Sequence, residues 1–128
     1  MPPIRLALIL LSMVLATTDA LAQGFDKCMR EADGVSSSML LCGSHEISAW
    51  DQRMNVAYQT LLARTNSASR IRLRNEQRAW LRHHLGETRR LATATDNGSA
   101  AFLDSQAFEL GDLRQRTLLL ESRVSRRQ

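Results

Sequence analysis

Few side chains of this 128-residue chain have the types and spacing that chemistry needs. His83 and His84 are adjacent, so on a helix they point about 100° apart and cannot bind one metal ion together. A zinc site would need more ligands than His45 could add. No nucleophile elbow or phosphate loop is present, and the carboxylates lack the paired spacing of general acid–base catalysts. They are Glu46, Glu76, Glu87 and Glu109. The sequence therefore predicts a protein that is not an enzyme, with no catalytic residue, metal site or cofactor.

The first 22 residues have the pattern of a secretory signal peptide. Arg5 precedes an apolar run from Leu6 to Ala16, and Ala20-Leu21-Ala22 has the A-x-A form of a cleavage site. The alternative is a transmembrane anchor, but the apolar run is too short to span a bilayer. No cysteine stands at the cleavage point, so lipid attachment is not expected there. We therefore expect a leader over 1–22, cleavage after Ala22 and export to the periplasm.

The two cysteines of the chain, Cys28 and Cys42, are expected to form a disulfide in such a compartment. Two free buried thiols are the alternative. Closing a loop of about 15 residues stabilises a fold by about 3 kcal/mol in the chain-entropy model. The spacing is wider than the CxxC of redox-active pairs, so the bridge is interpreted as structural. It would hold a short N-terminal helix against a longer one.

Residues 23–128 suffice for one small domain, and their composition favours helix. Both prolines lie in the leader, at Pro2 and Pro3. Apolar residues recur in steps of three and four, which predicts helices over 41–64, 69–93 and 100–122. The residues expected to face the core are Leu41, Ile47, Trp50, Met54, Ala57, Tyr58, Leu61 and Leu62, then Leu73, Gln77, Trp80, His84, Thr88 and Leu91, then Phe102, Leu103, Ala107, Leu110, Leu113, Thr117 and Leu120.

Loops are expected at 64–69 and 93–99, where polar and turn-forming residues interrupt the periodicity. Asn66 or Ser67 would cap the second long helix. The basic residues 122–128 are expected to form a frayed tail. The predicted fold class is therefore all-α, a small antiparallel bundle of three long helices plus a short N-terminal helix held by one disulfide.

Asn55 and Gln77 sit on or beside apolar stripes, where a buried amide must be hydrogen-bonded. We expect them to meet each other, or a backbone carbonyl, across the first two long helices, and ligand contact is the alternative. Trp50, Tyr58 and Trp80 are interpreted as core residues. An exposed Trp50 would instead favour an interface.

The order and spacing of these residues resemble the LprI-like family, over about residues 28–120. The positions that carry the resemblance are Met39, Cys42, Glu46, Trp50, Asp51, Met54, Asn55, Tyr58 and Leu61, then Leu73, Gln77 and Trp80, then Arg116, Thr117 and Leu120. The family is named for lysozyme inhibition by a lipoprotein, so the resemblance implies a helical fold and an inhibitor of a lysozyme-type muramidase. Glu46, Trp50, Asp51, Asn55, Tyr58, Gln77, Trp80 and Arg116 are interpreted as structural signature residues.

The chain departs from the family pattern after Trp80. Relatives commonly carry aromatic-Arg-Asp and then a cysteine there, with a further cysteine in the last helix. Here His83-His84-Leu85 and then Thr88 stand in their place, and the last position is about Phe108. Both partners of a second disulfide are therefore absent together. Phe108 is expected to replace that bridge by packing.

Two functions remain open. An inhibitor would block the muramidase cleft with a loop, 64–69 or 93–99, because occlusion needs only a rigid surface. The net charge of +4 gives no long-range steering toward basic lysozymes, although an arginine suits their acidic cleft. The alternative is a cell-envelope binding module that uses an Arg-rich face to bind an acidic protein or anionic lipid.

The candidate binding face comprises Arg72, Arg82, Arg89 and Arg90. One exposed cluster of these side chains would favour the envelope module. Pairing with carboxylates of the bundle would remove its basis, and a solvated helix face is the commoner origin of scattered arginines. Export argues against a nucleic-acid partner, and the sequence predicts no particular oligomeric state.

Overall fold

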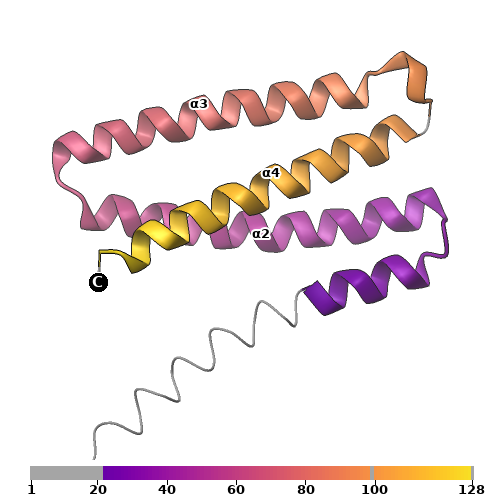
Figure 1. Ribbon diagram of the computed structural model, residues 1–128, viewed down its shortest axis with the longest axis horizontal. Coiled ribbons are helices and arrows are strands. Elements are labelled where there is room, and N and C mark those ends of the chain that lie inside the picture. The colour runs from indigo at the N-terminus through magenta and orange to yellow at the C-terminus, as the bar shows by residue number, and fades with distance from the viewer. Residues whose placement is uncertain (1–21, 99, 128) are drawn as a thin grey trace, which may run out of the picture. The chain divides into compact units, whose positions relative to one another are not determined.

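The computed structural model describes residues 22–98 and 100–127 (Figure 1). The predicted leader lies outside this range except for Ala22. The chain divides into two compact units, Met1–Cys42 and Gly43–Gln128. Regular structure in the described residues is helical throughout, which confirms the all-α prediction. None of the helices over 22–98 and 100–127 has both the length and the apolar character that crossing a bilayer requires.

The described part of the first unit is a helical hairpin closed by a disulfide. Residues 22–31 are helical, and a turn follows in which Asp33 and Gly34 have φ of 47° and 76°. Helix α2 then begins at Ser36. The bond joins Cys28 to Cys42, with Cα atoms 5.8 Å apart, so the predicted disulfide is confirmed.

Helix α2 spans Ser36–Arg64, and helix α3 spans Ser67–Ala92. Only two residues separate them, fewer than the predicted loop. Asn66 is the N-cap of α3, because its Oδ1 accepts a hydrogen bond from the Ser69 N–H at 2.9 Å. Such a cap satisfies one of the amides that a helix start leaves without a partner, so the capping prediction is confirmed.

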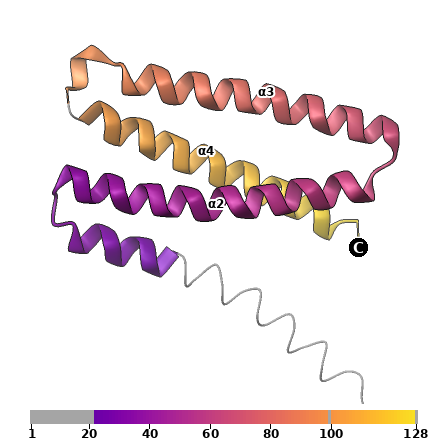
Figure 2. The same ribbon diagram turned by 180° about the vertical axis from the view of Figure 1, so that it is seen from behind.

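A short 3-10 helix η1, Thr95–Asn97, leads into helix α4, which spans Ala100–Ser125. Helices α3 and α4 run antiparallel and side by side (Figures 1 and 2). The prediction of a tail frayed from 122 onward was wrong for most of that segment. The helix continues to Ser125, and Arg123 forms a 2.7 Å ion pair with Glu76 of α3.

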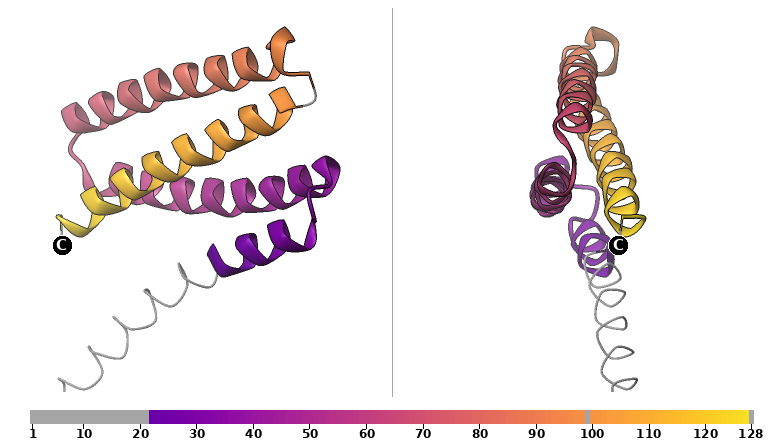
Figure 3. Two further views of the ribbon diagram at one scale, coloured as in Figure 1. Left: turned by 45° about the vertical axis from the view of Figure 1, so that its right-hand side comes forward. Right: turned by 90° about the vertical axis from the view of Figure 1, so that its left-hand side faces the viewer.

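The core of the second unit lies where α2, α3 and α4 face one another (Figure 3). Leu61, Thr117 and Leu120 are its most completely buried side chains. The other buried apolar members are Trp50, Met54, Ala57, Leu73 and Leu113. The predicted inward positions of α2 and α3 are buried or half-buried over most of their length, as helical periodicity requires.

Three predicted core positions were wrong. Leu41 and Phe102 are 58% and 57% exposed, and Ala107 is also exposed. In α4, Ala101 and Ser105 are buried in place of Phe102 and Ala107. The Ser105 hydroxyl donates to the Thr88 carbonyl at 2.8 Å, so this part of α4 presents its small side chains to α3. A large apolar residue at such a close approach would hold the two helices apart.

Candidate functional site

Trp50 is a core residue, 5% exposed, and its polar atom is paired. The indole N–H donates to Glu46 at 2.8 Å, and both side chains are buried. Arg53 and Arg114 lie over the ring, with guanidinium carbons 4.2 and 5.4 Å from its centroid. Such cation–π contacts stabilise a buried aromatic side chain. The expectation that Trp50 belongs to the core is confirmed.

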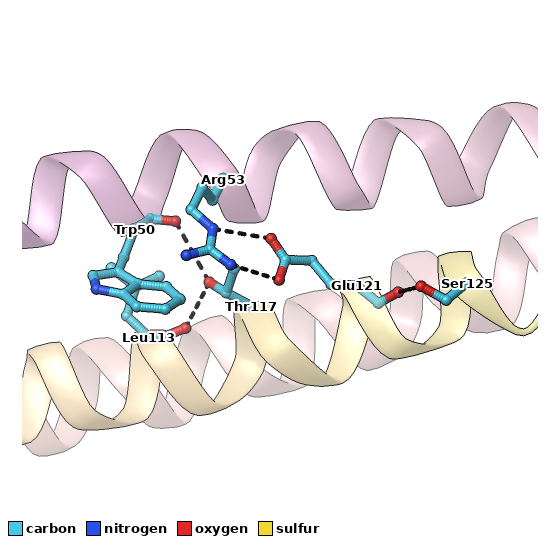
Figure 4. Close-up of polar contacts among 6 residues, drawn as sticks. All are labelled: Trp50, Arg53, Leu113, Thr117, Glu121 and Ser125. Carbon is cyan, nitrogen blue, oxygen red and sulfur yellow. Dashed lines mark hydrogen bonds and ion pairs between the residues drawn. The ribbon is translucent and has the colours of Figure 1, made fainter. Parts of the chain in front are cut away.

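A polar contact beside Trp50 joins α2 to α4 (Figure 4). Arg53 donates to both carboxylate oxygens of Glu121, at 3.0 and 2.8 Å. The fully buried Thr117 hydroxyl donates to the Leu113 carbonyl at 2.8 Å and lies 3.4 Å from the Trp50 carbonyl. Bidentate arginine–carboxylate geometry fixes orientation as well as distance. These side chains hold α2 and α4 in register, so we interpret their role as structural.

Gln77 does not meet Asn55, so that prediction was wrong. Gln77 accepts a hydrogen bond from Arg116 Nε at 2.9 Å, and its amide lies 3.6 Å from the Met54 sulfur. Asn55 is exposed and donates to Asp51 one turn before it, at 3.2 Å. Gln77 therefore faces the other helices of the bundle, whereas Asn55 faces outward from α2. The sequence alone does not determine how the two helices are rotated about their axes.

Arg116 is a buried cation, 8% exposed. Burial lowers the pKa of its guanidinium, and nearby Arg123 lowers it further, while Glu76 and Asp112 oppose the shift. Its Nη2 atom has no hydrogen-bond partner within the described residues. The ring of Trp80 lies 5.9 Å from its guanidinium carbon. The charge of Arg116 is therefore stabilised by the hydrogen bond to Gln77 and by the nearby carboxylates of Glu76 and Asp112.

His84 is committed to a second polar pair inside the bundle. Its Nδ1 lies 2.7 Å from a carboxylate oxygen of Asp112, and its ring stacks on Trp80 at 4.7 Å. His45 and His83 are exposed. Among the described residues, no three His, Cys, Asp or Glu side chains form a group able to hold a metal ion.

Phe108 and Thr88, the two positions at which the family resemblance implied a second disulfide, both take part in the α3–α4 contact. The Phe108 ring lies 6.2 Å from those of His83 and His84. Thr88 accepts from Ser105 through its carbonyl. Phe108 thus packs against α3, as expected from the sequence.

The four arginines of the predicted binding face do not lie together. Arg90 pairs with Glu87 at 2.9 Å, and Arg72 donates to Ser69 Oγ beside the α2–α3 turn. Arg82 and Arg89 point away from the core. They share a face of α3 with Arg74 and Arg78, which the predicted binding face did not include. We define the outer stripe as Ile71, Arg74, Arg78, Arg82, Leu85 and Arg89, all exposed. The sequence already indicated this shared face, because these positions are three or four residues apart.

A second concentration of arginine lies where the α2–α3 turn meets the C-terminal end of α4. A hollow of about 120 Å³ opens there, and its lining includes Thr65, Arg72, Arg123 and Arg127. In Figure 1 the C-terminal end of α4 lies beside the α2–α3 turn. We define the basic end as Arg64, Arg70, Arg72, Arg123, Arg126 and Arg127.

Two arginines of the basic end hold it together, and four remain available. Arg70 donates to the carbonyls of Leu62 and Thr65, at 3.1 and 3.2 Å, which satisfies the C-terminal end of α2. Arg123 is bound to Glu76. Arg64, Arg72, Arg126 and Arg127 are exposed and form no ion pair with a carboxylate in the described part of the chain.

The opposite end of the second unit has a different charge. Residues 93–104 contain no lysine or arginine, and they include Asp96 and Asp104. The two loops that the sequence offered as contact surfaces are therefore electrostatically distinct. The α2–α3 turn is surrounded by arginines, whereas the η1 loop follows the last turn of α3, where Arg89 and Arg90 stand and Arg90 is paired with Glu87.

The family model described as "Lysozyme inhibitor LprI" matches residues 28–120, most of the chain. No curated protein matches the chain. No solved structure matches it either.

Proposed function

Since this chain belongs to the lysozyme inhibitor LprI family, we propose that it is an exported, periplasmic and non-enzymatic binding protein that blocks the cleft of a lysozyme-type muramidase. Residues 1–22 would be removed as a signal peptide on export, and residues 23–128 would form the inhibitor. Blocking a cleft requires a shape and a charge that fit it, and no catalytic group.

The observation that carries this proposal is the set of four unpaired arginines at the basic end. A retaining lysozyme works with two carboxyl groups that flank the scissile bond, so its cleft attracts cations. Arg64, Arg72, Arg126 and Arg127 surround the α2–α3 turn, and none of them pairs with a carboxylate among residues 22–98 and 100–127. Arginine can bind a carboxylate through two parallel hydrogen bonds. The basic end therefore has the charge that an occluding surface needs.

The α2–α3 turn also has the rigidity of a good inhibitor. Asn66 caps α3, and Arg70 binds the carbonyls of Leu62 in α2 and Thr65 in the turn. Thr65 donates to the Leu61 carbonyl at 2.9 Å. A loop that is ordered before binding loses little conformational entropy in the complex, which favours affinity. The η1 loop at the other end carries acidic charge, which an acidic cleft would repel.

The net charge of +4 shapes the kinetics of such an inhibitor. Attraction between the basic end and the catalytic carboxylates acts at short range. A basic lysozyme would repel the whole molecule at longer range when the ionic strength is low, and moderate salt screens that repulsion beyond about 10 Å. We therefore expect no acceleration of binding at low ionic strength, in contrast to an acidic inhibitor.

The test is a muramidase assay on cell walls with the processed protein purified after export. A c-type lysozyme and a bacterial lytic transglycosylase are assayed in parallel, at low and physiological salt. We expect inhibition of at least one enzyme that saturates near one inhibitor per enzyme and persists in salt. No inhibition of either enzyme at micromolar excess would contradict the proposal.

Two variants with equal loss of charge then locate the surface. The basic-end variant is Arg64→Gln, Arg72→Gln, Arg126→Gln and Arg127→Gln, which spares the structural Arg70 and Arg123. The outer-stripe variant is Arg74→Gln, Arg78→Gln, Arg82→Gln and Arg89→Gln. We expect the first to weaken inhibition on the order of 10²-fold, as central arginines of an interface do, and the second to retain it. Equal weakening by both would show that net charge, and not the basic end, determines inhibition.

A further inference from the structure

The outer stripe is a continuous row of exposed side chains along α3. Its positions advance in steps of three and four residues, so they share one face of the helix. Ile71 and Leu85 are 59% and 52% exposed, and the four arginines lie between and beyond them. From Ile71 to Arg89 the row is about 27 Å long at 1.5 Å per residue. Among the described residues of the second unit, no other helix lies on the side of α3 away from α4 (Figure 3).

The charge of this row is not neutralised within the described part of the protein. The side chains of Arg74, Arg78, Arg82 and Arg89 form no hydrogen bond or ion pair within the described residues. The two carboxylates of α3 are engaged elsewhere, Glu76 by Arg123 and Glu87 by Arg90. A row of four unpaired cations is therefore available to an external anion.

We infer that the outer stripe docks this protein on an anionic phospholipid surface. Arginine binds phosphate through two parallel hydrogen bonds, and four arginines in one row can engage several headgroups together. Ile71 and Leu85 stand among these arginines, where they can enter the boundary between headgroups and acyl chains. Basic residues with interspersed apolar ones along a surface helix are typical of helices that lie in a membrane interface.

An acidic protein fits the same row less well. A stable protein interface buries about 800 Å² on each partner, around a core depleted of charge. On the outer stripe, the two apolar side chains are isolated from each other by arginines. The hollow that could receive a partner's side chain lies at the basic end instead. A straight, charged row suits a flat surface of phosphates.

This inference does not rest on the inhibitor role, because the outer stripe and the basic end share no residue. The two surfaces provide matched controls for each other. Loss of the basic end is expected to leave lipid binding in place, and loss of the outer stripe is expected to leave inhibition in place.

The test measures flotation of the processed protein with lipid vesicles at low and physiological salt. Vesicles of phosphatidylglycerol mixed with phosphatidylethanolamine are compared with vesicles of phosphatidylcholine. We expect binding to the anionic vesicles only, weakened by salt. The outer-stripe variant is expected to bind on the order of 10³-fold more weakly, at about fivefold for each of its four arginines near an anionic surface. The basic-end variant, with the same net charge, is expected to lose much less.

A second pair of variants tests the apolar contribution. Ile71→Ser with Leu85→Ser is expected to weaken binding about tenfold or more, since both side chains leave water on insertion. The control is Val56→Ser with Leu118→Ser, which removes exposed apolar side chains from α2 and α4 and is expected to have little effect. Circular dichroism verifies that each variant folds.

Three results would overturn the inference: equal binding to neutral and anionic vesicles, equal losses in the two arginine variants, or no binding to anionic vesicles. A parallel assay with polyglutamate identifies the other class of partner. Polyglutamate binding that depends on the outer stripe, without vesicle binding, would assign the row to an acidic protein and overturn the lipid assignment.

Discussion

Arg116 on α4 donates a 2.9 Å hydrogen bond to Gln77 on α3, and within the described residues no other side chain hydrogen-bonds its guanidinium. Arg116 is 8% exposed. The amide oxygen of Gln77 accepts the bond, while its nitrogen points to the Met54 sulfur of α2. One neutral side chain thus supports a buried charge and touches a second helix. Gln77 therefore matters for the stability of the whole three-helix contact.

Replacing Gln77 by leucine is expected to destabilise the protein by about 2–3 kcal/mol, because Arg116 then keeps its buried charge without a partner. Adding Arg116→Met should recover part of that loss, since the charge is removed as well. Urea denaturation of both single variants and the double variant measures the coupling. Gln115→Leu, at an exposed position of α4, is the control and should change stability by less than about 0.5 kcal/mol. Additive effects of the two core changes would contradict this account.

The disulfide is expected to stabilise the first unit locally. Cys28 and Cys42 are 14 residues apart, and a loop of about that length contributes about 3 kcal/mol in the chain-entropy model. Cys28→Ser with Cys42→Ser should increase amide hydrogen exchange in residues 22–42. Exchange in α3 and α4 should remain near that of the parent protein. Equal loss of protection in α3 would show that the disulfide supports the bundle globally.

Glu87 is expected to titrate below its ordinary range, because Arg90 donates a hydrogen bond to its carboxylate and lowers its pKa. A carboxyl pKa depressed by folding adds stability above the unfolded pKa, and this is lost as pH falls through the folded value. The effect on stability is expected to be small, since the pair is solvent-exposed. NMR titration of the side-chain carboxyl carbon should show a higher pKa in Arg90→Gln. The same pKa in both proteins would exclude the pair as the cause.

The α2–α3 turn is expected to link stability with inhibition. Asn66→Ala removes the hydrogen bond to the Ser69 amide and should cost about 1 kcal/mol. A less ordered turn should also inhibit a muramidase more weakly, although no charge has changed. Asn66→Ser, which keeps a capping oxygen, is the control and should stay close to the parent protein in both assays. Parent-like inhibition by Asn66→Ala would show that order in this turn does not contribute.

Local signals in the sequence were sufficient for the helices, the cap and the disulfide. Periodicity placed long helices where α2, α3 and α4 lie, and Asn66 caps the second of them. The errors fell on long-range contacts. Arg123 extends α4 beyond the predicted end by binding Glu76, which is 47 residues away. Phe102 has the hydrophobicity of a core residue and is exposed.

The amino-acid sequence by itself determined which stretches are helical and roughly which face of each is apolar, because helix formation depends on residues three and four apart. The rotation of each helix against its neighbours follows from the packing of all three at once. Because of that packing, Gln77 binds Arg116 and not Asn55, and Ala101 and Ser105 face α3. It also separated the arginines into those that bind within the bundle and the two unpaired sets, at the basic end and on the outer stripe. Charge and spacing can be read locally, but the pairing of charges requires the third dimension.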